Sequence, residues 1–144
     1  MMISTKGRYA LRVMVDMAEN GGDVGYMPLG GIAERQGLSE KYLESIIAVL
    51  VKAGILRGQR GKGGGYMLTK APSDYTVGSI LKLTEGSLAP VSCIEGCGEG
   101  CANASECRTL PVWKKLDTII DDYLEGVNLS DLMRSGSSAN GPCI

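Results

Sequence analysis

The stretch from Gly61 to Gly65 contains four glycines and one lysine, and it separates two short strand-forming runs, ILRGQR and YMLT. Glycine gives a chain its greatest backbone freedom and weakens the interiors of both helices and strands. Two strand-forming runs on either side of such a stretch are typical of a β-hairpin. Residues 55–69 therefore predict a hairpin with a flexible tip, which Arg60 and Lys62 make positively charged.

Three amphipathic helices are expected before this hairpin. Ser4 can cap the first helix, whose apolar residues recur with the helical period up to Gly21. A short helix over residues 29–36 stops at a glycine, and Ser39 then caps a third helix that ends before Gly54. Two helices joined by a tight glycine-containing turn predict a helix-turn-helix, and a basic hairpin after them predicts its winged form.

The second half of the chain predicts further helices around an irregular loop. Thr76 can cap a helix over residues 77–84, Pro111 suits the first turn of a long helix, and a short helix follows near residues 129–133. A one-sided apolar stripe of this length in so small a chain favours pairing with a second copy, the alternative being a helix folded onto its own domain. The stripe consists of Val112, Leu116, Ile119, Ile120, Tyr123, Leu124 and Val127.

The expected fold is mainly α with a small β-hairpin wing. Residues 1–73 form the winged helix-turn-helix domain, residues 74–134 hold dimerisation helices with a cysteine-rich loop at 90–109, and residues 135–144 form a flexible tail rich in Ser and Gly. The part up to residue 73 has ten Lys or Arg against six Asp or Glu, a net charge of +4, and the remainder has five against ten, a net charge of −5. This asymmetry favours a polyanionic partner for the N-terminal part, although a solvated surface produces the same division.

Composition disfavours several function classes. Charges are interleaved with apolar residues at the N-terminus, so neither a signal peptide nor a membrane span is expected, and the protein is assigned to the cytoplasm. The chain has no histidine, which removes Ser/His and Cys/His pairs and disfavours an enzyme with a small-molecule substrate. Lys62 is followed by glycines instead of Ser or Thr, which disfavours a nucleotide-binding phosphate loop.

The expected DNA-binding residues lie in the third helix and in the hairpin tip. Exposed positions near the N-terminus of a recognition helix reach base edges, an arginine-bearing loop fits a narrow minor groove, and glycines let the backbone approach phosphate. Solvated helix charges and a glycine-rich surface turn are the alternative interpretations. The predicted set is Ser39, Lys41, Tyr42, Glu44, Arg60, Lys62, Gly63 and Gly64.

Four of the five cysteines, Cys93, Cys97, Cys101 and Cys107, lie within fifteen residues. In a reducing compartment, clustered thiols indicate metal binding or redox chemistry and not structural disulfides. Thiolates bind iron–sulfur clusters or zinc, although the closely paired cysteines usual in zinc sites are absent. An iron–sulfur cluster, a zinc ion and metal-free thiol chemistry therefore all stay open, and Cys143 is interpreted as an incidental thiol.

Three motifs resemble those of one family of regulators. They are Ile3-Ser-Thr-Lys-Gly-Arg-Tyr-Ala-Leu at the N-terminus, Leu38-Ser-Glu-Lys-Tyr-Leu-Glu in the third helix and Arg60-Gly-Lys-Gly-Gly-Gly-Tyr in the hairpin. In order and spacing, from Met2 to about Met133, the chain is similar to the winged-helix transcription regulators of the IscR, NsrR and CymR type.

The resemblance implies a homodimer that binds double-stranded DNA. It implies that the long helix over residues 111–127 pairs across the dimer, that Arg60 enters the minor groove and that Glu44 selects the class of operator. It also implies an iron–sulfur cluster, as in the sensing members of the family. A cluster-carrying interaction protein that does not bind DNA would need the cysteines but not the basic hairpin tip.

Two departures from the family pattern concern this cluster. In IscR-like members a histidine three residues after the last cysteine completes a 2Fe–2S site, and Leu110 stands at that position here. The chain also has four cysteines where the pattern has three, so ligation by all four, with Cys97 as the added ligand, is the simplest reconciliation. A 4Fe–4S cluster completed by a carboxylate of the partner chain, as in the nitric-oxide-sensing branch, is disfavoured because the corresponding residue is Arg8.

Overall fold

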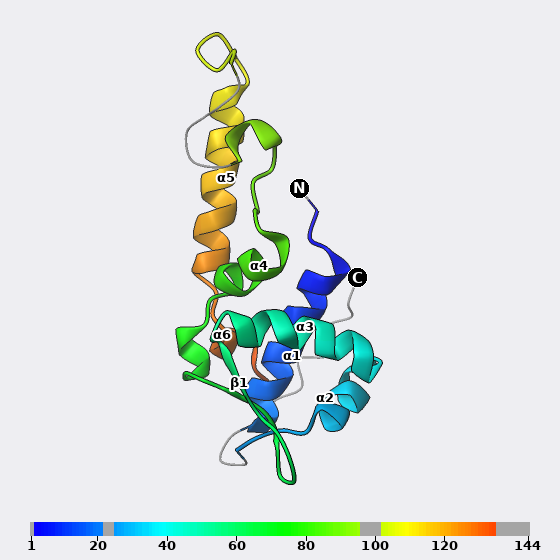
Figure 1. Ribbon diagram of the computed structural model, residues 1–144. Helices are drawn as coiled ribbons and strands as arrows, with labels where there is room; N and C mark the ends of the chain where they lie inside the picture. The colour runs from blue at the N-terminus through cyan, green and yellow to red at the C-terminus, as the bar shows by residue number, and fades with distance from the viewer. Residues whose placement is uncertain (1, 22–24, 96–101, 135–144) are drawn as a thin grey trace.

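The computed structural model describes residues 2–21, 25–95 and 102–134. Figure 1 shows a head that contains α1, α2, α3 and the hairpin, from which α5 projects as a long arm while the hairpin tip points the opposite way. In the described ranges no helix combines the length and the apolar character needed to cross a bilayer. The helices are α1 (Thr5–Gly21), α2 (Leu29–Gln36), α3 (Glu40–Lys52), α4 (Val77–Glu85), α5 (Leu110–Glu125) and α6 (Leu129–Leu132), the strands are β1 (Leu56–Gln59) and β2 (Gly65–Leu68), and short 3-10 helices lie at Pro72–Asp74 and Ser92–Ile94.

Local capping explains where two of these helices begin. Ser39 Oγ accepts a hydrogen bond from the backbone N–H of Tyr42 at 3.2 Å, and Thr76 Oγ1 accepts one from the N–H of Ser79 at 3.0 Å. Each hydroxyl satisfies an N–H group that the first helical turn leaves without an acceptor. The caps predicted at Ser39 and Thr76 are confirmed.

An apolar core joins α1, α2, α3 and β1 into the head. The same core includes three residues from beyond residue 73, namely Tyr75, Ile80 and Leu129. The two parts of the chain thus share this core, and the division into domains at residue 73 stays a prediction. Because one face of α3 is packed into this core, its exposed face is held at a fixed place on the head. The most deeply buried side chains of the core include Val13, Met14 and Met17 of α1, Ile32 of α2, and Leu43, Ile46, Ile47 and Leu50 of α3.

The two strands pair in antiparallel register from Leu56 opposite Leu68 to Gln59 opposite Gly65. The hydroxyl of Tyr75 closes the open end of this hairpin. It accepts hydrogen bonds from the N–H groups of Thr69 and Lys70 at 2.9 and 2.8 Å, and it donates one to the carbonyl of Ile55 at 3.0 Å. The buried tyrosine thereby fixes the base of the hairpin, and the expected β-hairpin wing is confirmed.

The apolar stripe predicted over residues 112–127 divides into two parts, and its last residue lies just beyond the end of α5 at Glu125. Leu124 of α5 and the following Val127 pack against a small cluster formed by Val77 and Leu81 of α4 together with Leu88. Val112, Leu116, Ile119 and Tyr123 are exposed, Ile119 to 52% and Tyr123 to 69%. The single stripe expected from the sequence therefore serves two surfaces, because α4 is too short to cover the whole arm.

Candidate nucleic-acid interface and cysteine site

The outward face of α3 carries the residues predicted to reach DNA bases. Lys41 and Glu44 are exposed, as is Ser39 at the cap, because the opposite face of the helix is buried in the core. Tyr42 is half-buried, and its ring meets that of Tyr9 edge to face with centroids 6.1 Å apart. Three of the four predicted helix residues are thus free to contact a ligand, and Tyr42 is braced against α1.

The hairpin tip presents two cations, since Arg60 and Lys62 are both exposed. Gly63 has a positive φ of 78°, and no heavy atom lies within 4 Å of the place where a Cβ would stand. Gly64 is different, because a Cβ there would overlap the backbone carbonyl of Gln59. Both glycines are predicted to let the backbone approach a DNA phosphate. The open space around Gly63 is compatible with this role. Gly64, in contrast, is required by the packing of the hairpin itself.

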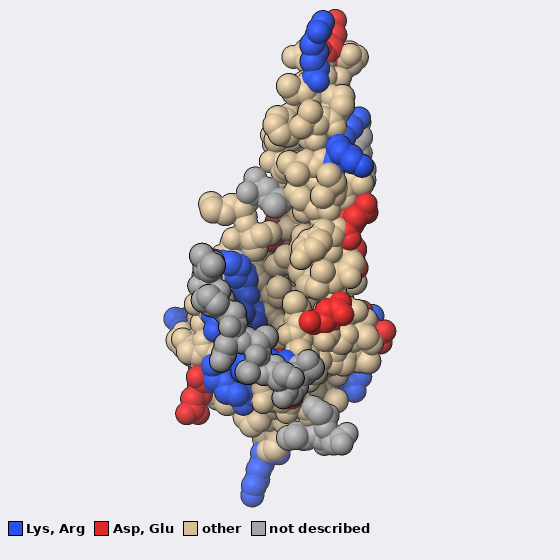
Figure 2. Space-filling view, turned by 180° about the vertical axis from the view of Figure 1, so that it is seen from behind, with Lys and Arg blue, Asp and Glu red and all other residues tan. Residues whose placement is uncertain are grey.

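A groove runs along α3 beside the hairpin and includes two of the predicted DNA-binding residues, Lys41 and Glu44. It is lined by Lys41, Glu44, Ser45, Lys52 and, from β2, Tyr66, along with apolar atoms of α3. Figure 2 shows a basic side chain projecting from the lowest point of the molecule, where Figure 1 has the hairpin tip. The charge pattern and the shape of this region suit an elongated anionic ligand.

Two of the four predicted metal ligands lie within the described residues. Cys93 is in the short 3-10 helix Ser92–Ile94, Cys107 stands just before α5, and both are half-buried free thiols. Cys97 and Cys101 fall outside the described residues. Among the residues that are described, no three Cys, Asp or Glu side chains are grouped closely enough to hold a metal ion.

The surroundings of Cys107 favour the ionised form of its thiol. The hydroxyl of Thr109, 3.4 Å from Cys107 Sγ, lowers the pKa of the thiol, and the backbone N–H groups of Thr109 and Leu110 lower it further. A lowered pKa favours the thiolate, which is the form that binds iron or zinc and the form that reacts in redox chemistry. This donor therefore fits a thiolate-ligated iron–sulfur cluster, and it fits zinc or free thiol chemistry equally well.

Polar contacts tie α5 to α4. Lys82 Nζ lies 2.6 Å from Asp121 Oδ1 and 3.0 Å from Glu125 Oε1, and the hydroxyl of Thr76 donates to Glu125 Oε2 at 2.7 Å. The bond from Thr76, followed by that from Lys82, lowers the pKa of Glu125. Asp121 and then Glu125 raise the pKa of Lys82. These contacts hold the head end of α5 against α4.

The family of this protein follows from its similarity to known proteins. The profile of the Rrf2 family, described as an iron-dependent transcriptional regulator, matches residues 3–135. The chain belongs to the Rrf2 family. The resemblance drawn from the three sequence motifs is thereby confirmed.

Named relatives of this Rrf2 protein are transcriptional regulators. The HTH-type transcriptional regulator IscR of Aliivibrio salmonicida is 38% identical over 133 residues, which are 92% of this chain and 77% of the relative. IscR of Escherichia coli O1:K1 / APEC is 36% identical over 135 residues, or 94% of this chain and 82% of the relative. This Rrf2 protein is therefore an IscR-like transcriptional regulator, and such regulators are generally not enzymes.

Solved structures confirm the expected fold class. CymR, the global cysteine regulator of B. subtilis, superposes with a TM-score of 0.73 at 34% identity, covering 92% of this chain and 95% of CymR. T. potens IscR superposes with a TM-score of 0.71 at 36% identity, covering 99% of this chain and 93% of that structure.

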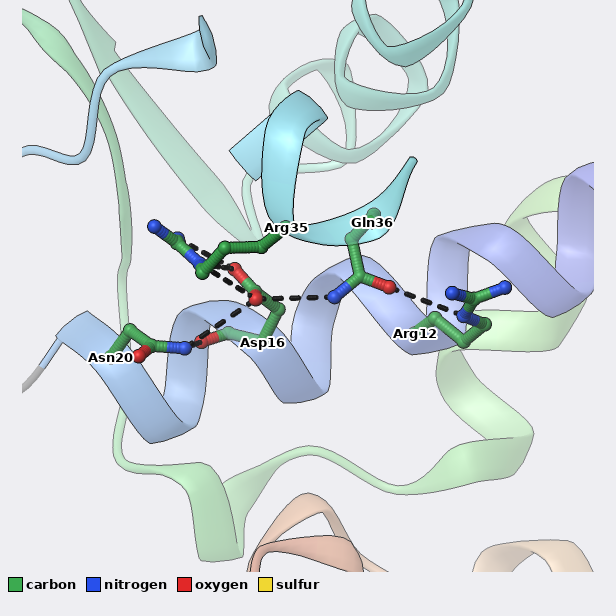
Figure 3. Close-up of polar contacts among 5 residues, drawn as sticks. All are labelled: Arg12, Asp16, Asn20, Arg35 and Gln36. Atoms are coloured by element: carbon green, nitrogen blue, oxygen red, sulfur yellow. Dashed lines mark hydrogen bonds and ion pairs between the residues drawn. The ribbon is translucent and has the colours of Figure 1, made fainter. Parts of the chain in front are cut away.

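A polar network around the buried Asp16 of this Rrf2 protein was not predicted from the sequence. Figure 3 shows Asp16 of α1 receiving hydrogen bonds from Arg35, Gln36 and Asn20. The Asp16 side chain is only 4% exposed, and Arg35 Nη2 lies 2.7 Å from its Oδ2. Asp16 comes three residues after the buried Val13, and a carboxylate at a core position of an amphipathic helix was the signal that a partner had to be found for it.

Proposed function

We propose that this Rrf2 regulator acts in the cytoplasm as a homodimer that binds a double-stranded DNA operator, and that an iron–sulfur cluster in its cysteine segment changes this binding. The proposal is based on the presence of a basic DNA-binding surface and a separate group of cysteines on one chain. The exposed face of α3 and the cationic hairpin tip lie on the head, whereas Cys93 lies in the 3-10 helix that follows α4 and Cys107 lies just before α5. The family's description as iron-dependent regulators supports the same reading.

In the proposed complex, α3 enters the major groove and the hairpin tip follows the adjacent backbone. Lys41 can donate to guanine or phosphate, and Glu44 can accept from a cytosine amino group. Arg60 reaches the minor groove, where a narrow groove concentrates negative potential, and Lys62 and Gly63 contact phosphate. The exposure of these side chains and the groove beside α3 support these roles.

Cys93, Cys97, Cys101 and Cys107 would hold the cluster, which we propose to be 2Fe–2S and not 4Fe–4S. When bound, it would supply a redox-active centre that can also be lost. Cys107 supports this ligand set because Thr109 and the start of α5 favour its thiolate. All-thiolate ligation places more negative charge on the iron than ligation that includes a neutral imidazole, so we expect a lower reduction potential than in a histidine-ligated centre.

Hydrogen bonds provide a route from the cysteine segment to the head. The segment lies between α4 and α5, and Glu85 at the end of α4 accepts hydrogen bonds from Ser4 at the start of α1. Glu125 at the end of α5 accepts a hydrogen bond from Thr76 at the start of α4. A change in the order of the cysteine segment would bias the placement of the two heads, and a dimer binds half-sites only at a fixed separation.

The exposed stripe of α5 supports the homodimer. Val112, Leu116, Ile119 and Tyr123 form an uncovered apolar face on one side of the arm. Burying such a face against the same face of a second copy removes apolar surface from water, and a two-fold interface requires a self-complementary patch of this kind.

A second candidate has the same fold but senses through zinc or through metal-free thiols. The observation that favours it is also Cys107, because a lowered thiol pKa promotes disulfide exchange as well as metal binding. A visible absorption spectrum of anaerobically purified protein, with analyses for iron, sulfide and zinc, separates the three alternatives. Iron and sulfide in equal amounts support the proposed cluster; zinc without sulfide, or neither metal, supports the second candidate.

DNA binding and sensing are tested together by titrating duplex DNA from the region upstream of the protein's own coding sequence at constant salt. We expect metal-loaded and metal-free protein to differ in affinity, and Cys101→Ala to behave as the metal-free form. Cys143→Ala is the matched control, because it removes a cysteine outside the cluster segment. Equal binding by all four samples would refute sensing by the cysteines, and no binding by any of them would refute the DNA-binding role on that duplex.

A further inference from the structure

The side chain of Arg12 is held in one orientation on the surface of the head. Its Nε donates to Oε1 of Gln36 at 3.1 Å, and the Nε2 of the same glutamine donates to Asp16 Oδ1 at 3.1 Å. The buried carboxylate of Asp16 therefore orients Gln36, and Gln36 in turn orients the guanidinium of Arg12. Figure 3 shows this chain of contacts, in which only the Nε of Arg12 is joined to Gln36 by a dashed line.

An aromatic ring supports the same guanidinium. Arg12 Cζ lies 4.9 Å from the ring centroid of Tyr9, a cation–π arrangement. Tyr9 in turn meets the ring of Tyr42 on α3. Arg12 is thus placed beside the N-terminal end of the helix that we propose enters the major groove, where the sugar–phosphate backbone borders that groove.

The two arginines of this network have different roles. Arg35 uses Nε and Nη2 on Asp16, which ties α2 to α1. Arg12 is exposed, and among the described residues its Nη1 and Nη2 have no hydrogen-bond or ion-pair partner. A guanidinium with its Nε already bound offers the planar Nη1–Nη2 edge, and this edge matches two oxygens of one phosphate.

We propose that Arg12 binds a backbone phosphate of the DNA beside the recognition helix, as a positioned anchor for the head. The inference rests on the proposed DNA binding and adds a contact outside α3 and the hairpin. Gln36 and Tyr9 already restrict the side chain, so little rotamer freedom remains to be lost on binding. A phosphate contact fixes the orientation of the protein on the duplex without reading its sequence.

The test measures the affinity of the full chain for two duplexes across a series of salt concentrations. One duplex comes from upstream of the protein's own coding sequence, and the other is a shuffled version of it. Arg12→Gln should weaken binding to both by the same factor, about threefold or more at fixed salt, and should lower the slope of log affinity against log salt by about one for each Arg12 that binds. Lys114→Gln, which removes one positive charge from an exposed site on α5, is the matched control and should leave the slope unchanged.

Arg12→Lys tests whether binding depends on the oriented planar guanidinium or only on its positive charge. Lysine keeps the charge but loses the Nε bond to Gln36 and the planar edge, so we expect weaker binding with a slope close to that of the wild type. Thermal melts of each variant show that it is folded. An unchanged slope for Arg12→Gln, a loss confined to one duplex, or full affinity in Arg12→Lys would each overturn the inference. Failure of the wild-type protein to bind either duplex would instead count against the proposed function.

Discussion

Glu85, the last residue of α4, binds the N-terminus of α1 through Ser4, 81 residues away in the sequence. Its Oε1 accepts the backbone N–H of Ser4 at 3.1 Å and the Ser4 hydroxyl at 2.5 Å. The same Ser4 oxygen accepts the N–H of Gly7 at 3.0 Å, which confirms Ser4 as the cap of α1. A Cβ on Gly7 would overlap Glu85, so a glycine is needed for this approach. The contact joins the helix that precedes the cysteine segment to the head.

Glu85→Ala is expected to lower the free energy of unfolding by about 1–2 kcal/mol, because it leaves the N–H and hydroxyl of Ser4 without their acceptor. Urea denaturation of the metal-free protein measures the change. Asp122→Ala is the control, since Asp122 is exposed and its carboxylate has no partner among the described residues. Equal losses in the two variants would contradict a specific role for Glu85.

Arg35→Met should destabilise the head by about 2–3 kcal/mol, because it leaves the buried carboxylate of Asp16 without its cation. Adding Asp16→Leu to this variant should recover part of the loss, since an apolar pair can replace a buried ion pair at small cost. The free energies come from denaturant unfolding of both variants, with Arg108→Met at an exposed position as the control. A double variant less stable than Arg35→Met alone would contradict the expectation.

The stability contributed by Glu125 should depend on pH. Its folded-state pKa is lowered by Thr76 and Lys82, so the ionised form stabilises the fold above the ordinary carboxyl pKa, and this contribution is lost as the pH falls through the lowered value. Glu125→Gln should therefore be less stable than wild type by about 1 kcal/mol at neutral pH, a modest cost because the group is partly exposed, and the difference should shrink below about pH 4. Lys82, whose pKa is raised, stays charged throughout this range.

Unfolding of metal-free protein at a series of pH values checks this prediction. Asp122→Asn removes a carboxylate of α5 that has no partner in the described part of the chain, and its difference from wild type should not follow the same pH curve. A Glu125→Gln difference that stays constant down to acid pH would count against the proposed linkage.

Gly65→Ala should detach the hairpin from the segment between α1 and α2. Tyr66 exchanges hydrogen bonds with Met27, N to O at 2.9 and 2.8 Å, and a Cβ on Gly65 would overlap the Met27 carbonyl. We expect a loss of about 2 kcal/mol or more in unfolding free energy, since the backbone has to move. Gly63→Ala, also at positive φ but with open space around it, should cost only about 1 kcal/mol of backbone strain.

Ile119→Glu should dissociate the proposed homodimer, because it places a charge on the exposed apolar face of α5. Sedimentation velocity measures the mass, which should fall from twice the chain mass of 15.2 kDa to that of one chain. Thr118→Glu, on a neighbouring exposed position outside the apolar stripe, should stay dimeric. Wild-type protein that sediments as a single chain would remove the basis for the interface.

Local sequence signals were sufficient to predict the helices and the hairpin. Ser39, Thr76 and the glycine-rich stretch after Arg60 act on residues within a few positions of themselves, so the helix starts and the hairpin were predicted close to where they lie. The family was evident for the same reason, because its motifs are short and contiguous. The DNA-binding residues and the four-cysteine ligand set stay predictions.

The long-range pairings were decided only by the tertiary structure. Helical periodicity shows which residues share a face, but it does not show what covers that face, so Leu124 packs on α4 while Ile119 is left exposed on the same helix. Asp16 and Arg35 are 19 residues apart, and no local pattern links a carboxylate to its cation at that separation. The sequence by itself determined the elements and the family, since these depend on neighbouring residues. The fold decided which charges are paired, which apolar surface is exposed, and which surface arginine is held in place by its neighbours.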